Sequence, residues 1–313
     1  MKKVNNNILF LVLVALLGTF VATKIFRSPR LESNVRKDLV AIDSGAISKV
    51  EIAPSNSAQE ILLLREGNTW MVQRAAKKHK ADNSTVRSVL GMMQNVQAER
   101  MISRKKEKWE EFNVGDKGTR ITFYAGTNKK GTIHIGKTGF SNTGSMYGGT
   151  GYNYVRLAGE NEVYRVNEFL ESAFNRPFDD WRDKTFLRVP KNKVTRIAFN
   201  YPADSSFILE KRDSVWVVGN QVAEKSKVEN FLGQLSYKNL NKFLDDFTPA
   251  KPADVMIVIE GEGGTLSTVE AWSTDNGWAL RASQQNDVVF SSSTSGVERD
   301  LLVGAKHFID KRT

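Results

Sequence analysis

Eight residues of the sequence match the pattern of a phosphate-binding loop. They run from Gly131 to Thr138 and satisfy G-x-x-x-x-G-K-[ST] at every position. In that motif a loop exposes backbone N–H groups to phosphate oxygens, and a helix begins directly after it. Here residues 132–135 alternate as a strand does, and a glycine-rich stretch follows in place of a helix. The context therefore argues against a nucleotide, and we expect none to bind.

Other residue types that carry chemistry are sparse and scattered. Histidine occurs only at His79, His134 and His307, without the i, i+4 spacing that places two metal ligands on one helix face. Cysteine is absent, and no G-x-S-x-G elbow presents a serine. Three acidic pairs could serve a glycosidase but are more typical of solvated or capped helix ends: Glu110-Glu111, Asp179-Asp180 and Asp245-Asp246. We expect a protein that is not an enzyme and that uses no metal or cofactor.

The glycine-rich stretch from 139 to 152 is the one long insertion in the sequence. Its composition predicts a mobile hairpin tip, and loops of this kind are where binding functions are often added. The alternative reading is a contact loop for a protein partner or a glycan. The candidate contact residues are Gly144, Met146, Tyr147, Gly148, Gly149 and Tyr152.

Two basic runs flank the first predicted helix along the chain. A solvated protein face is the simpler interpretation, and contact with anionic lipid headgroups or an acidic partner is the alternative. Nucleic-acid binding is not expected, because readers of single strands interleave exposed aromatics with such runs and only Trp109 is nearby. The candidate basic contact residues are Lys77, Lys78, Lys80, Arg104, Lys105 and Lys106.

The elements that must position these residues occur twice along the chain. Residues 47–52 match 194–199 as alternating strands, and 61–72 match 207–218 as hairpins whose second strand carries Trp70 or Trp216. A helix follows each hairpin, with apolar residues at i, i+4 and i+7 of one stripe in 81–93 and 223–235. The strands at 120–125 and 131–135 resemble 255–260 and 264–269. The segments 154–157 and 163–164 correspond to 279–282 and 289–290.

This order predicts an α+β fold with two duplicated units of antiparallel strands, each with one or two helices. The first unit is expected at 44–190 and the second at 191–313. A second helix is predicted at 166–176 in the first unit, with a shorter counterpart at 295–302.

An apolar run precedes this body at the N-terminus. Residues 8–26 lack acids, carry one lysine near the end and are about long enough to span a bilayer as a helix. A cleaved signal peptide is the rival interpretation, but the sequence offers only a weak small-x-small cleavage site. We expect a cytoplasmic head and transmembrane anchor at 1–27 and a stalk at 28–43. The body is expected on the periplasmic or outer side, and it carries +7 of the chain's formal net charge of +10, because Lys2, Lys3 and Lys24 lie in or beside the anchor.

The order of these motifs resembles a bacterial family known only as the domain of unknown function 4340. The resemblance rests on the strand before the first hairpin, the Gly-Asn-Thr-Trp-Met-Val pattern at 67–72, Tyr-Val-Arg at 154–156 and Arg-Asp-Lys at 182–184. Proteins of that family look like single-anchor envelope proteins, often encoded beside ABC-type transport components. The resemblance implies an accessory role and supplies no catalytic residue.

We therefore expect a non-enzymatic protein of the bacterial inner membrane, with a single pass. Its predicted role is an accessory or scaffold component of an ABC-type transport or surface-assembly system, in contact with integral membrane proteins of that complex. The alternative is a module that binds envelope polysaccharide or peptidoglycan.

Overall fold

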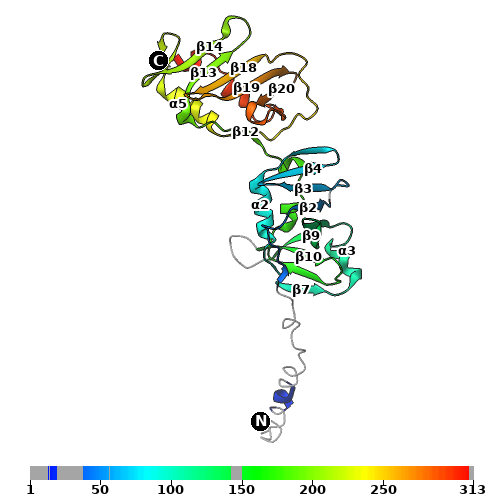
Figure 1. The fold of residues 1–313 in the computed structure, drawn as a ribbon. Coiled ribbons are helices and arrows are strands. Elements are labelled where there is room, and N and C mark those ends of the chain that lie inside the picture. Colours follow the sequence, from blue (N-terminus) through cyan, green and yellow to red (C-terminus); the bar gives the residue numbers. More distant parts are fainter. Residues whose placement is uncertain (1–12, 14, 20–37, 56, 142–149, 310–313) are drawn as a thin grey trace, which may run out of the picture. The chain divides into compact units, whose positions relative to one another are not determined.

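A computed structural model describes residues 13, 15–19, 38–55, 57–141 and 150–309 of the chain. The chain divides into two compact units, residues 1–182 and 183–313. Each unit contains an antiparallel sheet and a few helices, so the expected α+β class with mostly antiparallel strands is found (Figure 1).

The first unit is built on a nine-stranded sheet in the order β5-β4-β3-β2-β8-β9-β10-β11-β7. A small ladder pairs β1 (Asp38–Val40) with β6 (Val96–Gln97). The strands of the main sheet are β2 (Lys49–Ala53), β3 (Ile61–Glu66), β4 (Thr69–Arg74), β5 (Lys77–Lys80), β7 (Arg100–Ser103), β8 (Thr119–Ala125), β9 (Asn128–Ser141), β10 (Thr150–Leu157) and β11 (Val163–Val166). The helical segments are α2 (Asn83–Met92), η2 (Lys106–Lys108), α3 (Trp109–Phe112), α4 (Leu170–Phe174) and η3 (Phe178–Trp181).

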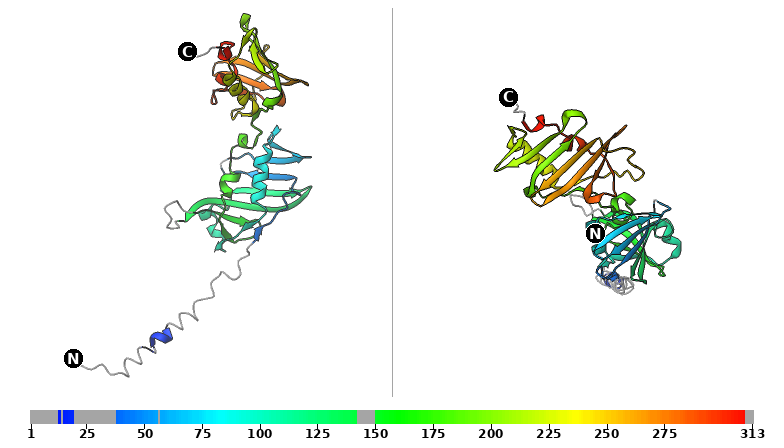
Figure 2. Two further views of the ribbon diagram at one scale, coloured as in Figure 1. Left: turned by 90° about the vertical axis from the view of Figure 1, so that its left-hand side faces the viewer. Right: turned by 45° about the horizontal axis from the view of Figure 1, so that its top comes forward.

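One face of this sheet is covered by α2, which lies across the strands (Figure 2). Alternation along each strand decides which side chains face the helix, because successive residues point to opposite faces. Thus Val50 and Ile52 of β2 are buried in the same cluster as Val86 and Leu90 of α2. The large side chains of α4 and η3 complete that core: Leu170, Phe174, Phe178 and Trp181.

The second unit repeats this arrangement with eight strands in the order β16-β15-β14-β13-β18-β19-β20-β21. A small ladder again pairs β12 (Thr185–Leu187) with β17 (Lys238–Asn239). The sheet strands are β13 (Val194–Asn200), β14 (Phe207–Arg212), β15 (Val215–Val218), β16 (Gln221–Val222), β18 (Val255–Gly261), β19 (Gly264–Thr274), β20 (Gly277–Ala282) and β21 (Phe290–Ser291). The helical segments are η4 (Lys191–Lys193), η5 (Ala203–Ser205), α5 (Lys225–Ser236), η6 (Ser283–Gln285), α6 (Val297–Leu301) and α7 (Lys306–Ile309).

The two sheets share their strand order and their pairing register. Ile52 faces Ile61 on one neighbouring strand and Ile121 on the other. In the second sheet Phe199 faces Phe207 and Ile257. The hairpin alignment expected from the sequence therefore agrees with the structure, whereas the alignment of β8 with β18 moves by one residue. The first sheet differs by its ninth strand, β7, for which the second sheet has no counterpart.

Three segments differ from the sequence-based expectations. The helix expected at 166–176 is confined to α4, because residues 163–166 are buried as strand β11. Residues 38–40 of the expected stalk form β1, and Leu39 lies in the first core with 3% of its surface exposed. The units divide eight residues before the expected boundary at 190, because β12 pairs with β17 of the second unit.

The expected anchor falls largely outside the residues that the structure describes. Of residues 8–26, only 13 and 15–19 are described. Within the described part of the chain, no helix has the length and apolar character needed to span a membrane.

Helix α2 begins at a side-chain cap that a substitution can test. A carboxylate oxygen of Asp82 accepts hydrogen bonds from the backbone N–H groups of Ser84 at 2.8 Å and Thr85 at 3.2 Å. Burial raises the pKa of Asp82, but these bonds and the one from the Ser84 hydroxyl outweigh it and hold the pKa below its usual value. The cap is therefore complete near neutral pH and is lost as the pH falls through and below the ordinary range of an aspartate.

We predict that Asp82→Ala lowers the free energy of unfolding by about 1 kcal/mol, because two backbone donors lose their acceptor. Urea unfolding at pH 7 measures this cost. Glu224 occupies the corresponding position before α5 and makes no side-chain bond to that helix's N–H groups, so Glu224→Ala is the matched control and should cost less. Equal costs for the two variants would contradict the assigned role of the Asp82 cap.

Candidate functional site

The face of the first sheet turned away from α2 carries a mixture of apolar and charged side chains. We call it the open face, defined by side chains of four adjacent strands that are half-buried except for Thr122, which is buried. Their alternate neighbours are buried in the core, which fixes the side to which these residues point. The open face consists of Lys49 and Glu51 on β2, Leu62 and Leu64 on β3, Met71 on β4, and Thr122 and Tyr124 on β8.

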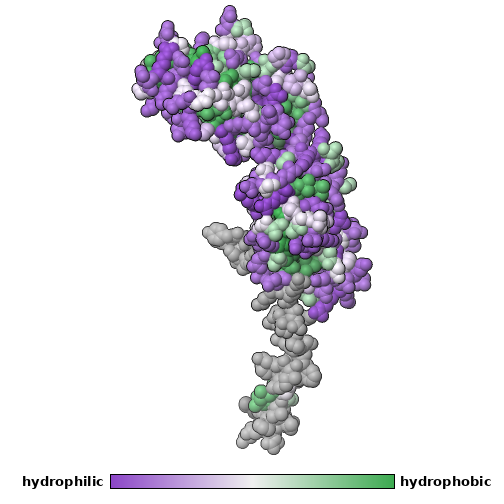
Figure 3. Space-filling model, in the orientation of Figure 1, coloured by the Kyte–Doolittle hydropathy of each residue, from purple (hydrophilic) through white to green (hydrophobic). Residues whose placement is uncertain are grey.

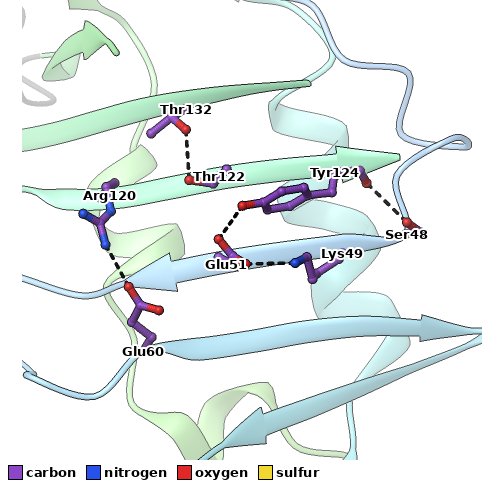
Figure 4. A network of polar contacts seen from close by, with 8 residues as sticks. All are labelled: Ser48, Lys49, Glu51, Glu60, Arg120, Thr122, Tyr124 and Thr132. Atoms are coloured by element: carbon purple, nitrogen blue, oxygen red, sulfur yellow. Dashed lines mark hydrogen bonds and ion pairs between the residues drawn. The ribbon is translucent and has the colours of Figure 1, made fainter. Parts of the chain in front are cut away.

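A polar network occupies the centre of the open face (Figure 4). Glu51 accepts hydrogen bonds from the Lys49 ammonium at 2.9 Å and from the Tyr124 hydroxyl at 2.7 Å. The Lys49 ammonium also lies 3.9 Å from the centroid of the Tyr124 ring. At the border of the network, Arg120 forms an ion pair with Glu60 at 2.8 Å.

The chemistry of this network is that of a structural ion pair. Burial raises the pKa of Glu51, but the hydrogen bonds from Lys49 and Tyr124 outweigh it and lower the pKa below its usual value. Tyr124 and Lys49 each donate a hydrogen bond to Glu51, and each of these bonds raises the pKa of its donor. A general acid or base works best with a pKa near the ambient pH, and all three groups are moved away from it. The network therefore orders β2 and β8 and is not arranged for proton transfer.

His134 lies beside this network in a row of basic residues. It faces Arg120 on β8 and Arg156 on β10 in the strand register. The buried Arg156 donates to the backbone oxygens of Val114 and Leu157, and its guanidinium lies 3.7 Å from the centroid of the Trp109 ring. Burial first, and then the charges of Arg156 and Arg120, lower the pKa of His134 to about 4.

The lowered pKa of His134 predicts a pH dependence of stability. The unfolded chain binds a proton at this histidine near pH 6.5 and the folded chain only near 4, so stability is lost as the pH falls between these values. We expect His134→Gln to lose less stability over that window than the native chain does, as measured by urea unfolding at pH 7 and pH 4.5. An NMR titration that found His134 protonated at pH 5.5 in the folded chain would contradict the prediction.

The residues that match the phosphate-binding pattern lie within strand β9. Gly131 and Thr138 both pair with neighbouring strands, and β9 continues to Ser141 where the pattern would require a helix to begin. Gly136 is required by packing, because a Cβ atom there would clash with the carbonyl oxygen of Phe112 and would lie 2.8 Å from a methyl group of Val114. Gly136 thus has a structural explanation, and the Lys137 ammonium lies 5.9 Å from the Phe112 ring centroid.

Gly131 and Gly136 should therefore respond differently to substitution by alanine. We predict that Gly136→Ala destabilises the fold by about 1–3 kcal/mol, because the new methyl group forces the 112–114 segment away from β9. Gly131→Ala is the control, since nothing lies within 4 Å of a Cβ atom at that position. Thermal unfolding of both variants tests the difference, and a Gly131→Ala variant as unstable as Gly136→Ala would refute it.

The candidate contact loop is described only in part. Gly144, Met146, Tyr147, Gly148 and Gly149 lie outside the described residues. Tyr152 is described on β10, and its ring lies 3.7 Å from the Arg165 guanidinium and edge-on to the Tyr154 ring.

Two aromatic side chains that the sequence analysis did not single out border this loop. Phe140, near the end of β9, has 70% of its surface exposed, and Phe169 has 48% exposed. Their ring centroids lie 6.4 Å apart, and the Phe169 ring lies directly over Gly151, where a Cβ atom would clash with it. The only sequence signal for this pair was the position of Phe140 within the glycine-rich stretch at 139–152.

The two basic runs lie on different edges of the first sheet. Lys77, Lys78 and Lys80 belong to the edge strand β5, whereas Arg104 to Lys106 directly follow the other edge strand, β7. The structure therefore does not bring the two runs together. Lysines on an edge strand discourage pairing with another chain, which gives the β5 run a structural reason. Lys78 forms an ion pair with Glu66, Lys106 lies 5.3 Å from the Trp109 ring centroid, and Arg104 contacts the sulfur atom of Met101 at 3.1 Å.

The candidate metal ligands remain dispersed. Within the described ranges, no three histidine, aspartate or glutamate side chains gather as a metal site would require.

These observations define a class of protein with two antiparallel α+β units, each with one sheet face packed against a helix. Within that class, the chain belongs to the family of the domain of unknown function DUF4340, which matches residues 70–255. The matched region begins in β4 of the first unit and ends in β18 of the second, so it spans both units. No curated protein and no solved structure shows a significant match to the chain.

Proposed function

We propose that this chain is a non-enzymatic, membrane-anchored envelope protein that acts as an accessory or scaffold component of an ABC-type transport or surface-assembly system. The apolar run at residues 8–26 would hold it in the bacterial inner membrane, with the body on the periplasmic or outer side. The family resemblance supports the transport association, and the body would contact integral membrane proteins of the complex.

The observation that carries the proposal is the exposed pair Phe140 and Phe169. Large aromatic side chains exposed together are uncommon on a monomeric surface and are typical of the centres of protein interfaces. Figure 3 shows that the visible surface is mainly hydrophilic and that hydrophobic residues gather in separate patches. Phe140 belongs to the glycine-rich stretch at 139–152, the one long insertion in the sequence.

The matching strand orders support a further part of the proposal, that the two units are duplicates of one ancestral unit. Six sequence features recur in the same order, and the two hairpins have equivalent registers. Besides strand β7, one difference lies in a connection: β19 and β20 are joined by a turn at Asp275-Asn276, where the first unit has residues 142–149 between β9 and β10. Insertion into one copy of a duplicated scaffold is a common way to add a binding surface.

The test is site-specific photo-crosslinking in native membranes from position 140. We expect an integral membrane protein of a transport system to be captured there, because the Phe140 ring is the most exposed large apolar side chain of the described body. The control carries the crosslinker at Asn128, an exposed position at the opposite end of the same strand. Phe169→Ser should weaken capture from position 140, since it removes the neighbouring aromatic surface.

The scaffold proposal loses its basis if position 140 recovers no integral membrane protein. It is also refuted if Asn128 captures the same proteins equally well, because the contact would then not be centred on the aromatic pair.

A second candidate function, a module that binds envelope polysaccharide or peptidoglycan, is favoured by one specific observation. A polar pocket beside α2 offers hydrogen-bonding groups of the kind that sugar hydroxyls use.

A further inference from the structure

The first unit has a pocket of about 460 Å³ between the β3–β4 hairpin and one side of α2. The hairpin contributes Arg65, Asn68 and Trp70, and the helix contributes Asn83 and Arg87. Trp70 has 5% of its surface exposed, so its indole is an apolar wall of the pocket that is already fixed in the core. The volume lies in the range of sites for small ligands, about 300–1,000 Å³.

The charge of the pocket is positive and is not neutralised by its lining. Both arginines are exposed, no acidic residue lines the pocket, and neither arginine forms an ion pair within the described part of the chain. Arg65 donates to the carbonyl oxygens of Gly45 at 2.6 Å and Gly67 at 3.2 Å, and Arg87 donates to that of Asn83 at 3.1 Å. These carbonyls hold the guanidinium groups in place and leave further N–H donors on each. A guanidinium group suits a carboxylate, because it can bind the two carboxylate oxygens with two parallel hydrogen bonds.

The remaining lining supplies neutral groups in fixed orientations. The side-chain oxygen of Asn83 accepts a hydrogen bond from the backbone N–H of Trp70 at 2.8 Å, so the NH₂ group of Asn83 remains available as a donor. Gln94 also lines the pocket and donates to the Ser44 hydroxyl at 2.5 Å, so its amide oxygen remains available as an acceptor. A donor and an acceptor beside two cations match a ligand that carries both hydroxyl groups and a carboxylate.

The corresponding place in the second unit has a different charge pattern. Trp216 corresponds to Trp70 and Lys211 to Arg65, but Glu229 stands where the first unit has Arg87. Glu229 is 4.0 Å from Lys191 in an ion pair. The pair of cations is therefore a property of the first unit alone, although the scaffold around it is shared.

We propose that this pocket binds an acidic saccharide, with Arg65 and Arg87 on its carboxylate and Asn83 and Gln94 on its hydroxyl groups. The inference rests on the second candidate function and names its ligand class. It does not depend on the scaffold role or on the contact at Phe140.

Isothermal titration of the full chain, purified in detergent, with trigalacturonate tests the proposal. We expect saturable binding that Arg87→Glu weakens about tenfold or more, because one charge-assisted contact is replaced by a repulsion. The substituted residue is the one that the second unit already carries at this helical position. Lys211→Glu makes the same charge reversal at the counterpart of Arg65 and should leave the affinity unchanged.

Two competitors distinguish the sources of the binding energy. Maltotriose, a neutral trisaccharide, should bind far more weakly, and inorganic phosphate should displace trigalacturonate only at much higher concentration. Equal binding of maltotriose, easy displacement by phosphate, or no binding of trigalacturonate overturns the proposal. Arg65→Gln, measured in parallel, keeps the test valid if Arg87→Glu fails to fold. All these measurements lack membrane partners, so their failure leaves the crosslinking test of the scaffold role unaffected.

Discussion

The burial of one sheet face beneath a single helix is the constraint on which each unit depends. In the first unit Val86, Val89 and Leu90 of α2 supply the stripe that meets the strands. In the second unit Val228, Phe231, Leu232 and Leu235 of α5 do the same. Because a strand alternates its side chains between two faces, filling one face with apolar residues leaves the other for different use. The open face, with its Lys49–Glu51–Tyr124 network, follows from this division.

Residues buried in packing contacts and residues exposed at the margin of the helix–sheet contact have different roles. Arg156, Gly136 and the aromatic rings of α3 are used to seat the 104–118 segment on β9 and β10. The Arg65 and Arg87 pair stands instead at the margin of the helix–sheet contact, where the side chains remain exposed and no carboxylate offsets them. Buried charges such as Arg156 hold segments of the fold in place, whereas exposed guanidinium groups held only by carbonyls remain able to engage a ligand.

Local patterns predicted the elements better than they predicted the site. The alternation around Trp70 and Trp216 and the helical stripes were sufficient to place the hairpins and the principal helices. Val166 was placed in a helix because a buried strand with apolar residues on both faces has no periodicity that separates it from a helix. The contact between Glu51 and Tyr124 joins residues 73 positions apart, and the pocket beside α2 requires knowledge of how the helix crosses the hairpin. Neither can be read from spacing along the chain.

Strand β9 has 14 residues, and only residues 133–135 pair with both neighbouring strands. The residues before them pair with β8, whereas 138–141 pair with β10 alone. Strand β10 pairs with β11 from Asn153 onward, so 139–141 and 150–152 form a two-stranded ribbon about 10 Å long. Two-stranded ribbons are weak by themselves, but here Tyr152 packs over Gly139 and Phe169 over Gly151. These ring contacts stabilise the hairpin. The glycines, whose composition predicted a mobile tip, therefore also leave the space in which the two rings pack beside Phe140.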